Sequence, residues 1–363
     1  MNANKANNSH RFLLAKFNVD YIVQFRTPRR IRQALGDLSI PDPMVIDGSN
    51  PERDNERRMD DVYNRIVREI REQPRDNQNY AFRALSWIGY AARTLTVQEL
   101  LVAISVEPNQ YQLDDSDMIR FEDLLDVCNG LVIADGQDVR LVHFSVRNYL
   151  DRHQVLRGDA GETYRAIACS TYLSLDALKE NHGDYLSLDP TGLERDFPFL
   201  YYAANKLTFH LSKVECRNYP ETTSAVMKLL EKKGHRRVYC RARRRIGVPL
   251  DIPRLNLACA IGYEDAVRTL LGEGDVNVNA DDSTIGLTSL SWAVLMGHEA
   301  VVNRLLGEDE VDLSCNGNMP LSLAIEQKRT GIVRLLLEKG VEVNVTYDGA
   351  SQSDYRRMYC YSC

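Results

Sequence analysis

Long hydrophobic runs are missing from this sequence of 363 residues. The longest mostly apolar stretch, Leu100–Val106, is far shorter than the roughly 20 residues that a membrane-spanning helix needs. The first residues, MNANKANNSHR, contain no hydrophobic signal core. Eight cysteines are scattered along the chain, and only Cys360 and Cys363 form a CxxC pair, so a disulfide framework is not expected. We therefore expect an intracellular chain without a membrane span.

Signatures of catalysis and of ligand binding are also missing. The phosphate-binding pattern GxxxxGK[ST] and the nucleophile pattern GxSxG do not occur. The histidines are dispersed, and a single CxxC without a second ligand pair is more typical of a frayed terminus than of a zinc site. The net charge of −6 argues against nucleic-acid binding by the whole molecule. These absences predict a protein that is not an enzyme and that uses no cofactor, metal or small-molecule substrate.

Three related segments are present near the C-terminus. They are LNLACAIGYEDAVRTLL from Leu255, LSWAVLMGHEAVVNRLL from Leu290 and LSLAIEQKRTGIVRLLL from Leu321, so their starts lie 35 and 31 residues apart. Each contains a short helix with small residues, a break, a second helix that ends in a leucine pair, and a closing segment rich in Val, Asn and Asp. A period near 33 residues with this plan is that of ankyrin repeats. The segments predict a short array of about three repeats.

The openings and turns of these repeats depart from the ankyrin pattern. The usual Thr-Pro-Leu-His opening is replaced by PRLN from Pro253, TSLS from Thr288 and MPLS from Met319. Gly262 and Gly297 end the first helices of two repeats, whereas Lys328 stands at the third, which predicts a strained or different turn there. Three imperfect repeats are near the minimum for a stable solenoid, so we expect the preceding helices to cap the array.

One column of apolar positions is a candidate partner-binding surface. Ankyrin repeats bind through the hairpin tips and the inner face of the first helices, and the variable inner positions are Leu257, Ile261, Trp292, Met296 and Leu323. An exposed apolar column with a tryptophan is typical of a binding hot spot. The alternative is that these side chains fold under the hairpins or touch the preceding domain. The sequence leaves both interpretations open.

The segment upstream of the repeats has the pattern of a winged helix. Apolar residues at helical spacing from Met59 to Ile70 predict an amphipathic helix. A second helix follows, and Thr96 with Glu99 forms a capping box that opens a third. The segment RFEDLLDVCNG predicts a helix closed by Gly130, and LVIADGQDVRLVHF predicts a hairpin around Asp135 and Gly136. Ser145 is predicted to cap the next helix, VRNYLDRH.

In their order along the chain, several segments resemble fungal NACHT–ankyrin proteins: FLLAKFNVDYI, TPRRIRQAL, VYNRIVREI, ALSWIGYAARTLTVQELLVAISV, FEDLLDVCNGLVIAD and VRLVHFSVRNYL. In that family an ATPase domain is followed by a winged helix of the GPI inositol-deacylase type, helices and ankyrin repeats. The resemblance implies a mainly α-helical fold with the following parts: 1–75, a helical bundle remnant; 76–155, a winged helix; 156–249, a helical connector; 250–350, ankyrin repeats; 351–363, a flexible tail. Without a P-loop, ATP hydrolysis cannot be carried over.

Two further features allow alternative interpretations. His143 stands where nucleotide switches of this class place a winged-helix histidine against a phosphate, but a histidine that bonds the next helix start is favoured, because one imidazole holds a nucleotide poorly. Lys228–Arg245 contains nine basic residues, among them Arg241, Arg243, Arg244 and Arg245, which form a candidate nuclear-import or anion-binding segment. A solvated helix and loop is the simpler interpretation of that cluster.

The sequence as a whole predicts a cytoplasmic scaffold or adaptor that binds a protein partner through its ankyrin repeats. Two alternatives stay open: a nuclear co-regulator of transcription, with the basic cluster as its import signal, and a regulatory subunit of an intact NACHT-type ATPase. The expected partner is a protein, and neither nucleic acid nor a membrane is expected as a partner.

Overall fold

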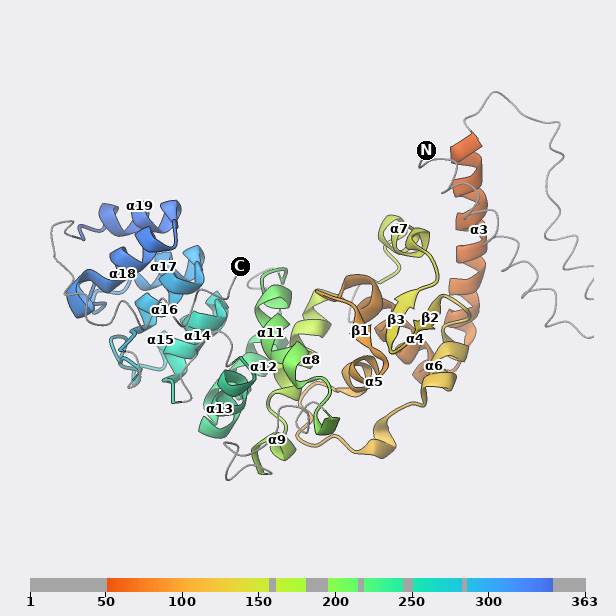
Figure 1. Cartoon of the computed structure of the whole chain (residues 1–363), viewed down its shortest axis with the longest axis horizontal. Coiled ribbons are helices and arrows are strands. Elements are labelled where there is room, and N and C mark those ends of the chain that lie inside the picture. The colour runs from red at the N-terminus through yellow and green to blue at the C-terminus, as the bar shows by residue number, and fades with distance from the viewer. Residues whose placement is uncertain are drawn as a thin grey trace, which may run out of the picture. The chain divides into compact units, whose positions relative to one another are not determined.

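The structure is a computed structural model, and it describes residues 51–156, 161–180, 195–214, 219–243, 251–282 and 286–341. Two predicted features therefore lie outside the described residues: the N-terminal segments before residue 51 and the CxxC of Cys360 and Cys363. Arg244 and Arg245 also lie outside them. The described residues divide into two compact units, of which the first comprises 51–89 with 120–156 and the second comprises 90–119 with the residues after 160. The fold is mainly helical, as predicted (Figure 1).

Helix α3 (Pro51–Glu72) opens the first unit and presents one apolar stripe. The predicted positions of this stripe are all buried: Met59, Val62, Tyr63, Ile66, Val67 and Ile70. Helix α4 (Arg75–Tyr90) follows and buries Leu85 and Trp87 completely. The side-chain amide of Gln73, between the two helices, donates a hydrogen bond to the carbonyl oxygen of Val127, 3.0 Å away. This bond ties the end of α3 to the end of α6.

The wing is a short antiparallel hairpin. Strand β2 (Val132–Asp135) pairs with β3 (Asp138–Leu141), and Asp135 lies opposite Asp138. Gly136 has a φ of 66°, which is the left-handed region that a two-residue hairpin turn requires. The hairpin follows helices α4, α5 (Val97–Ser105) and α6 (Phe121–Val127), so the order of elements predicted for a winged helix is confirmed.

The predicted helix caps are partly confirmed in this region. Strand β1 (Leu95–Thr96) leads into α5, where Thr96 and Glu99 form the predicted capping box with both hydrogen bonds present. The end of α6 differs, because Cys128 is its C-cap and the left-handed conformation is shared by Asn129 and Gly130. Helix α7 (Phe144–Arg152) has His143 as its N-cap, so the prediction that Ser145 caps this helix is wrong.

The connector in the second unit is a set of short helices: α8 (Glu162–Tyr172), α9 (Asp176–Glu180), α11 (Leu200–Leu211), α12 (Pro220–Glu231) and α13 (Lys233–Ala242). Helix α8 contacts both α11 and α12. An aromatic cluster fills the space between them, with Phe199 stacked on Tyr202 and edge-on to Tyr172. Helix α12 also contacts α14 and α15, so the connector caps the first repeat, as we expected.

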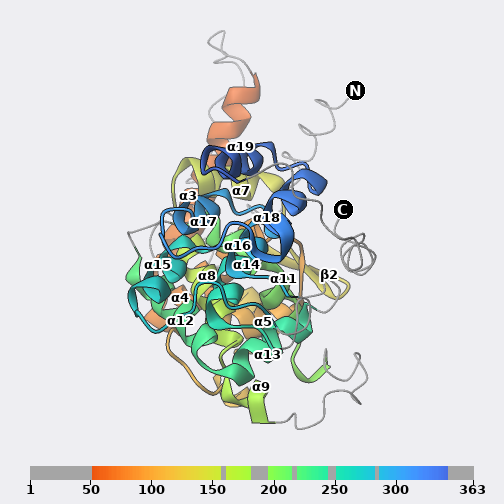
Figure 2. The same cartoon turned by 90° about the vertical axis from the view of Figure 1, so that its left-hand side faces the viewer.

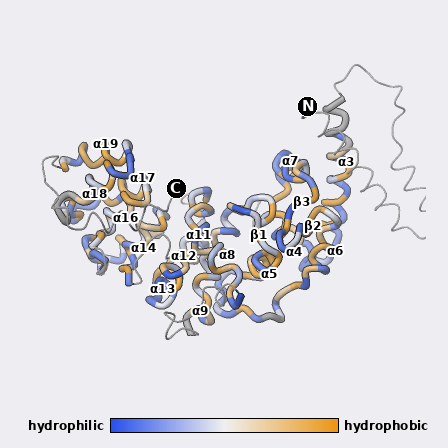
Figure 3. Tube along the Cα trace, in the orientation of Figure 1, coloured by the Kyte–Doolittle hydropathy of each residue, from blue (hydrophilic) through white to orange (hydrophobic). Residues whose placement is uncertain are grey.

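The repeats are three helix pairs: α14 (Arg254–Ile261) with α15 (Glu264–Gly272), α16 (Ser289–Met296) with α17 (Glu299–Leu305), and α18 (Cys315–Glu326) with α19 (Thr330–Glu338). Each first helix contacts the next first helix, and each second helix contacts the next second helix, which gives the stacked layers of Figures 1 and 2. Figure 3 shows hydrophobic and hydrophilic residues interspersed along these helices. Helices α14 and α16 are buried from Leu255 to Ile261 and from Ser289 to Leu295, whereas the second helices α15, α17 and α19 keep an exposed side.

The turns between the two helices of each repeat have the conformations that the sequence predicted. Gly262 and Gly297 are left-handed C-caps of α14 and α16, with φ of 84° and 77°. Lys328 has a φ of 55°, so the predicted irregular turn of the third repeat is a lysine held in the left-handed region. Helix α18 also starts earlier than expected, at Cys315, so Pro320 lies inside it rather than at its first position.

Candidate functional site

The predicted apolar column of the array is not exposed. Leu257, Ile261 and Trp292 have 0% exposure and Leu323 has 5%, whereas Met296 is half-buried. The expected exposure of this column is therefore wrong, and the alternative interpretation, in which these side chains are covered by other parts of the chain, agrees with the structure. For Trp292 one reason is Asp282, a buried residue in the connection between α15 and α16, whose carboxylate accepts the indole N–H.

Buried polar groups hold this connection in place. The indole nitrogen of Trp292 donates to Oδ2 of Asp282 at 2.9 Å, and the backbone N–H of Leu287 donates to the same carboxylate. The Asn256 amide donates to the carbonyl oxygens of Ala280 and Leu287, and it accepts from the Ser289 hydroxyl. These contacts join the first repeat to the start of the second. A buried network of this kind is stable only when its members are paired.

The hairpin side of the array remains accessible. The Asn279 amide donates to the carbonyl oxygen of Glu310 at 2.7 Å, and its oxygen accepts from the backbone N–H of Asp312 at 2.8 Å. These two bonds connect the hairpin region of the first repeat with that of the second. Exposed side chains project from both regions: Asp275, Asn277, Asp281, Asp309, Glu310 and Asp312. We call these six residues the hairpin surface, and five of them are acidic.

The inner turns form a second ladder between repeats. The His298 ring covers Gly262, where an added Cβ would lie 2.4 Å from ring atoms, and the Arg329 guanidinium covers Gly297 in the same way. Nε2 of His298 donates to the carbonyl oxygen of Ala260 at 3.2 Å. Burial lowers the pKa of His298, and the nearby guanidiniums of Arg243 and Arg329 lower it further, against the bond to Ala260. His298 is therefore a neutral spacer between repeats.

Residues 255–347 match the family model for ankyrin repeats, in three copies. The array is an ankyrin array. Residues 69–159 match the model for the winged helix domain of GPI inositol-deacylase. No curated protein is significantly similar to the chain. Ankyrin repeats indicate protein–protein interaction, and a winged helix earlier in the same chain is consistent with an architecture associated with NACHT proteins. The remaining domain boundaries stay predictions.

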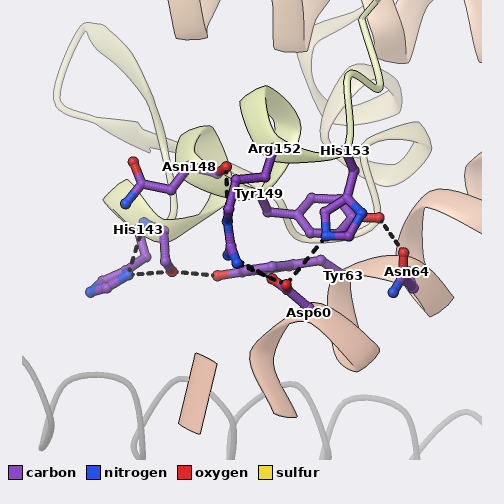
Figure 4. A network of polar contacts seen from close by, with 9 residues as sticks. Asp60, Tyr63, Asn64, His143, Asn148, Tyr149, Arg152 and His153 are labelled. Atoms are coloured by element: carbon purple, nitrogen blue, oxygen red, sulfur yellow. Dashed lines mark hydrogen bonds and ion pairs between the residues drawn. The ribbon is translucent and has the colours of Figure 1, made fainter. Parts of the chain in front are cut away.

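A polar network joins α3 to α7, which lies within the segment that matches the winged helix (Figure 4). Asp60 accepts two hydrogen bonds from the Arg152 guanidinium, at 2.8 and 3.0 Å, and its Oδ2 lies 3.2 Å from Nε2 of His153. The Tyr149 hydroxyl donates to Oδ1 of Asn64 at 2.7 Å. Asp60 thus receives contacts from two side chains at the end of α7, and the network serves to hold two helices of the first unit together.

His143 takes part in this network as a helix cap. Its Nδ1 accepts from the backbone N–H of Ser145, and it lies 2.7 Å from the Ser145 hydroxyl, which lies 2.7 Å from the Tyr63 hydroxyl. Burial raises the pKa of Tyr63 to about 12, so this phenol stays protonated. The His143 ring also packs on Phe144, whose side chain is exposed. This geometry is that of the favoured interpretation, a histidine that bonds the start of the next helix.

Most of the described basic cluster forms structural contacts. Arg236 donates to the carbonyl oxygens of Leu230 and Ile252, and Lys233 pairs with Asp251. Arg243 donates to the Tyr239 hydroxyl at 2.6 Å and packs over its ring. Arg241 is half-buried. The described part of the cluster thus lies mainly on α13, where Lys233 and Arg237 are exposed and Arg236 is half-buried, and its role in import or anion binding stays a prediction.

A buried relay in the connector was not anticipated from the sequence. Nδ1 of His210 lies 2.8 Å from Oε2 of Glu162, and Nε2 lies 3.0 Å from the Tyr202 hydroxyl, which accepts from the backbone N–H of Ala92. Arg165 pairs with the other carboxylate oxygen. Burial raises the pKa of Glu162, but hydrogen bonds from His210 and Arg165 lower it more, to about 2. Arg165 is only three residues from Glu162, but His210 is 48 residues away, too distant for local patterns to show.

Two further features are absent from the part of the chain that the structure describes. No group of three or more His, Cys, Asp or Glu side chains there could hold a metal ion. No helix there is long and apolar enough to cross a membrane.

Proposed function

We propose that this chain is a non-catalytic scaffold or adaptor whose ankyrin array binds a protein partner through the hairpin surface. The observation that carries the proposal is the row of exposed side chains on two hairpin regions that Asn279 holds in register. Such a row is prearranged before a partner arrives, so little conformational entropy is lost on binding. Its acidic side chains favour a partner with a basic surface.

In this proposed function the connector anchors the ankyrin array, and the winged helix relates the chain to a class of signalling proteins. The connector covers the first repeat through α12, so the array is anchored at its N-terminal end. The winged helix and its resemblance to NACHT-associated domains favour a role beside signalling ATPases of that class, in the cytoplasm. The chain would then supply a binding surface rather than nucleotide turnover.

The proposal is tested by charge reversal on the hairpin surface. The tagged full chain is purified from its own cells together with its bound proteins, and the variant Asp281→Lys with Asp309→Lys is treated in the same way. Both side chains are exposed, so the melting temperature should not change. Specific partners should be lost from the variant. A matched control is Glu122→Lys, an exposed acid on α6 outside the array.

Partners that bind equally well to the hairpin variant would refute the role of this surface. A purified chain that turned over a small molecule would refute the non-catalytic function itself. Tagged wild-type protein found in the nucleus would favour the transcriptional alternative.

A further inference from the structure

In the last repeat, a position that is buried in the first two repeats is exposed to solvent. Alignment of the repeats places Ile325 of α18 with Cys259 of α14 and Val294 of α16. Cys259 and Val294 are 0% exposed, whereas Ile325 is 57% exposed. The Cys259 side chain hydrogen-bonds to Ser289, the first residue of α16, so this position faces the following repeat. Ile325 holds the same position on the last repeat that the structure describes.

The second helix of the last repeat shows a smaller difference. Leu337 of α19 aligns with Leu271 at the end of α15, which is half-buried, and with Leu306 at the end of α17, and its exposure is 43% against 6% for Leu306. One helical turn before these side chains lie Ser322 on α18 and Arg334 on α19, and both are exposed. We call these four residues the terminal face: Ser322, Ile325, Arg334 and Leu337. It has two apolar side chains with polar neighbours, which is the usual composition of a protein interface.

The charge of the last repeat also differs from that of the first two. In the first two repeats each arginine has a carboxylate partner: Arg254 pairs with Glu273, Arg268 with Asp265 and Arg304 with Glu308. From α18 to the C-cap of α19 the sequence has four basic residues and two acidic ones. The four are Lys328, Arg329, Arg334 and Lys339, and none of them forms an ion pair with another described residue. The last repeat therefore carries uncompensated positive charge.

We infer that the terminal face binds an amphipathic, acidic helix of a partner protein, stacked on α18 and α19. The shape follows from the register, because α14 and α15 of the first repeat contact α16 and α17 of the next, and the Cys259 position meets the start of α16. The apolar side of the ligand contacts Ile325 and Leu337, and its carboxylates face Arg334. This inference goes beyond the proposed function, because it adds a second surface, away from the hairpins and with the opposite charge.

The test uses two synthetic amphipathic peptides with the same leucine stripe, one with glutamates and one with lysines on the polar side. Fluorescence anisotropy with the full-length protein measures each dissociation constant. The glutamate peptide should bind more tightly, and Ile325→Asp should weaken it at least tenfold. Arg334→Glu should reverse the preference between the two peptides. Two matched controls should have no effect: Phe144→Asp, a side chain also 57% exposed, and Arg237→Glu, an exposed arginine on α13.

Several results would overturn the inference. These are equal binding of both peptides, no binding of either, and binding that Ile325→Asp leaves unchanged. Sedimentation that shows a wild-type oligomer and an Ile325→Asp monomer would mean that a second copy covers the face. Ile325-dependent binding of a peptide of residues 342–363 would assign the face to the chain's own C-terminal segment. Ile325→Ser and Leu337→Ser repeat the test if the aspartate variant does not fold.

The two proposals can fail separately. Partners that bind the wild-type chain but ignore Ile325→Asp would refute only the terminal face. Loss of partners from the hairpin variant alone would leave the peptide result unaffected.

Discussion

The indole of Trp292 and the carboxylate of Asp282 are both fully buried and joined by a hydrogen bond of 2.9 Å. The tryptophan lies in the first helix of the second repeat, and the aspartate lies in the connection that precedes it. The same carboxylate accepts from the backbone of Leu287. Trp292 therefore fixes the loop between two repeats instead of presenting its ring to a partner.

The first prediction follows for Trp292→Ala. The variant removes a large core side chain and one donor from a buried carboxylate, so the free energy of unfolding should fall by about 3–5 kcal/mol. Urea denaturation followed by circular dichroism measures this change. Met296→Ala is the matched control, because that side chain is half-buried and should cost much less. A Trp292→Ala variant that is as stable as the wild type but no longer binds a partner would contradict this role and would show that the ring belongs to the binding surface.

The second prediction concerns the left-handed turn at Lys328. Left-handed backbone costs a non-glycine residue about 1–2 kcal/mol, whereas glycine adopts it freely. Lys328→Gly should therefore raise the free energy of unfolding by about 1 kcal/mol. Lys328→Gln controls for the lost charge and should give no gain. The reverse change, Gly262→Ala, should destabilise, because its Cβ would collide with the His298 ring. Thermal melting of the three variants decides the matter.

The third prediction is a pH dependence at Glu162. The pKa of this carboxyl is about 2 in the folded chain and 4.5 at its ordinary value. Because the folded pKa is the lower one, the stabilisation is complete above about pH 4.5 and is lost as the pH falls toward 2. Glu162→Gln should lower stability at pH 6 and reduce the fall of stability between pH 5 and 3. Urea unfolding at several pH values measures both.

A control separates this effect from general acid denaturation. Glu310→Gln removes an exposed carboxyl of the hairpin surface and should leave the pH profile close to that of the wild type. If Glu162→Gln and Glu310→Gln gave the same profile, the relay through His210 would not be the cause.

The fourth prediction distinguishes the two roles of His143. As the N-cap of α7, its ring accepts from the backbone of Ser145, so His143→Ala should lower the free energy of unfolding by about 1 kcal/mol. Phe144→Ala, a change at the exposed neighbour, should have little effect. Calorimetric titration with ADP should give the same result for the wild type and for His143→Ala. A variant of unchanged stability that had lost nucleotide binding would support the phosphate-contact interpretation.

The sequence by itself determined the local elements of this protein. The apolar spacing from Met59 to Ile70, the capping box of Thr96 and Glu99, and the glycines that end α14 and α16 are all as expected, because each depends on residues within a turn or two of one another. The repeat period likewise predicted the ankyrin array, which the family match confirms.

Only the tertiary structure decided which side chains face solvent. The inner column of the repeats has the same pattern whether it is covered or not, and the residue that bonds the Trp292 indole, Asp282, is not marked by the periodicity. The relay joins Glu162 of α8 to Tyr202 and His210 of α11, two helices that are far apart in the sequence. The exposure of Ile325 could not be predicted from the sequence either, because Ile325 is as hydrophobic as the aligned residues Cys259 and Val294, which are buried. Burial is a property of neighbours in space, and local sequence specifies those neighbours only within an element.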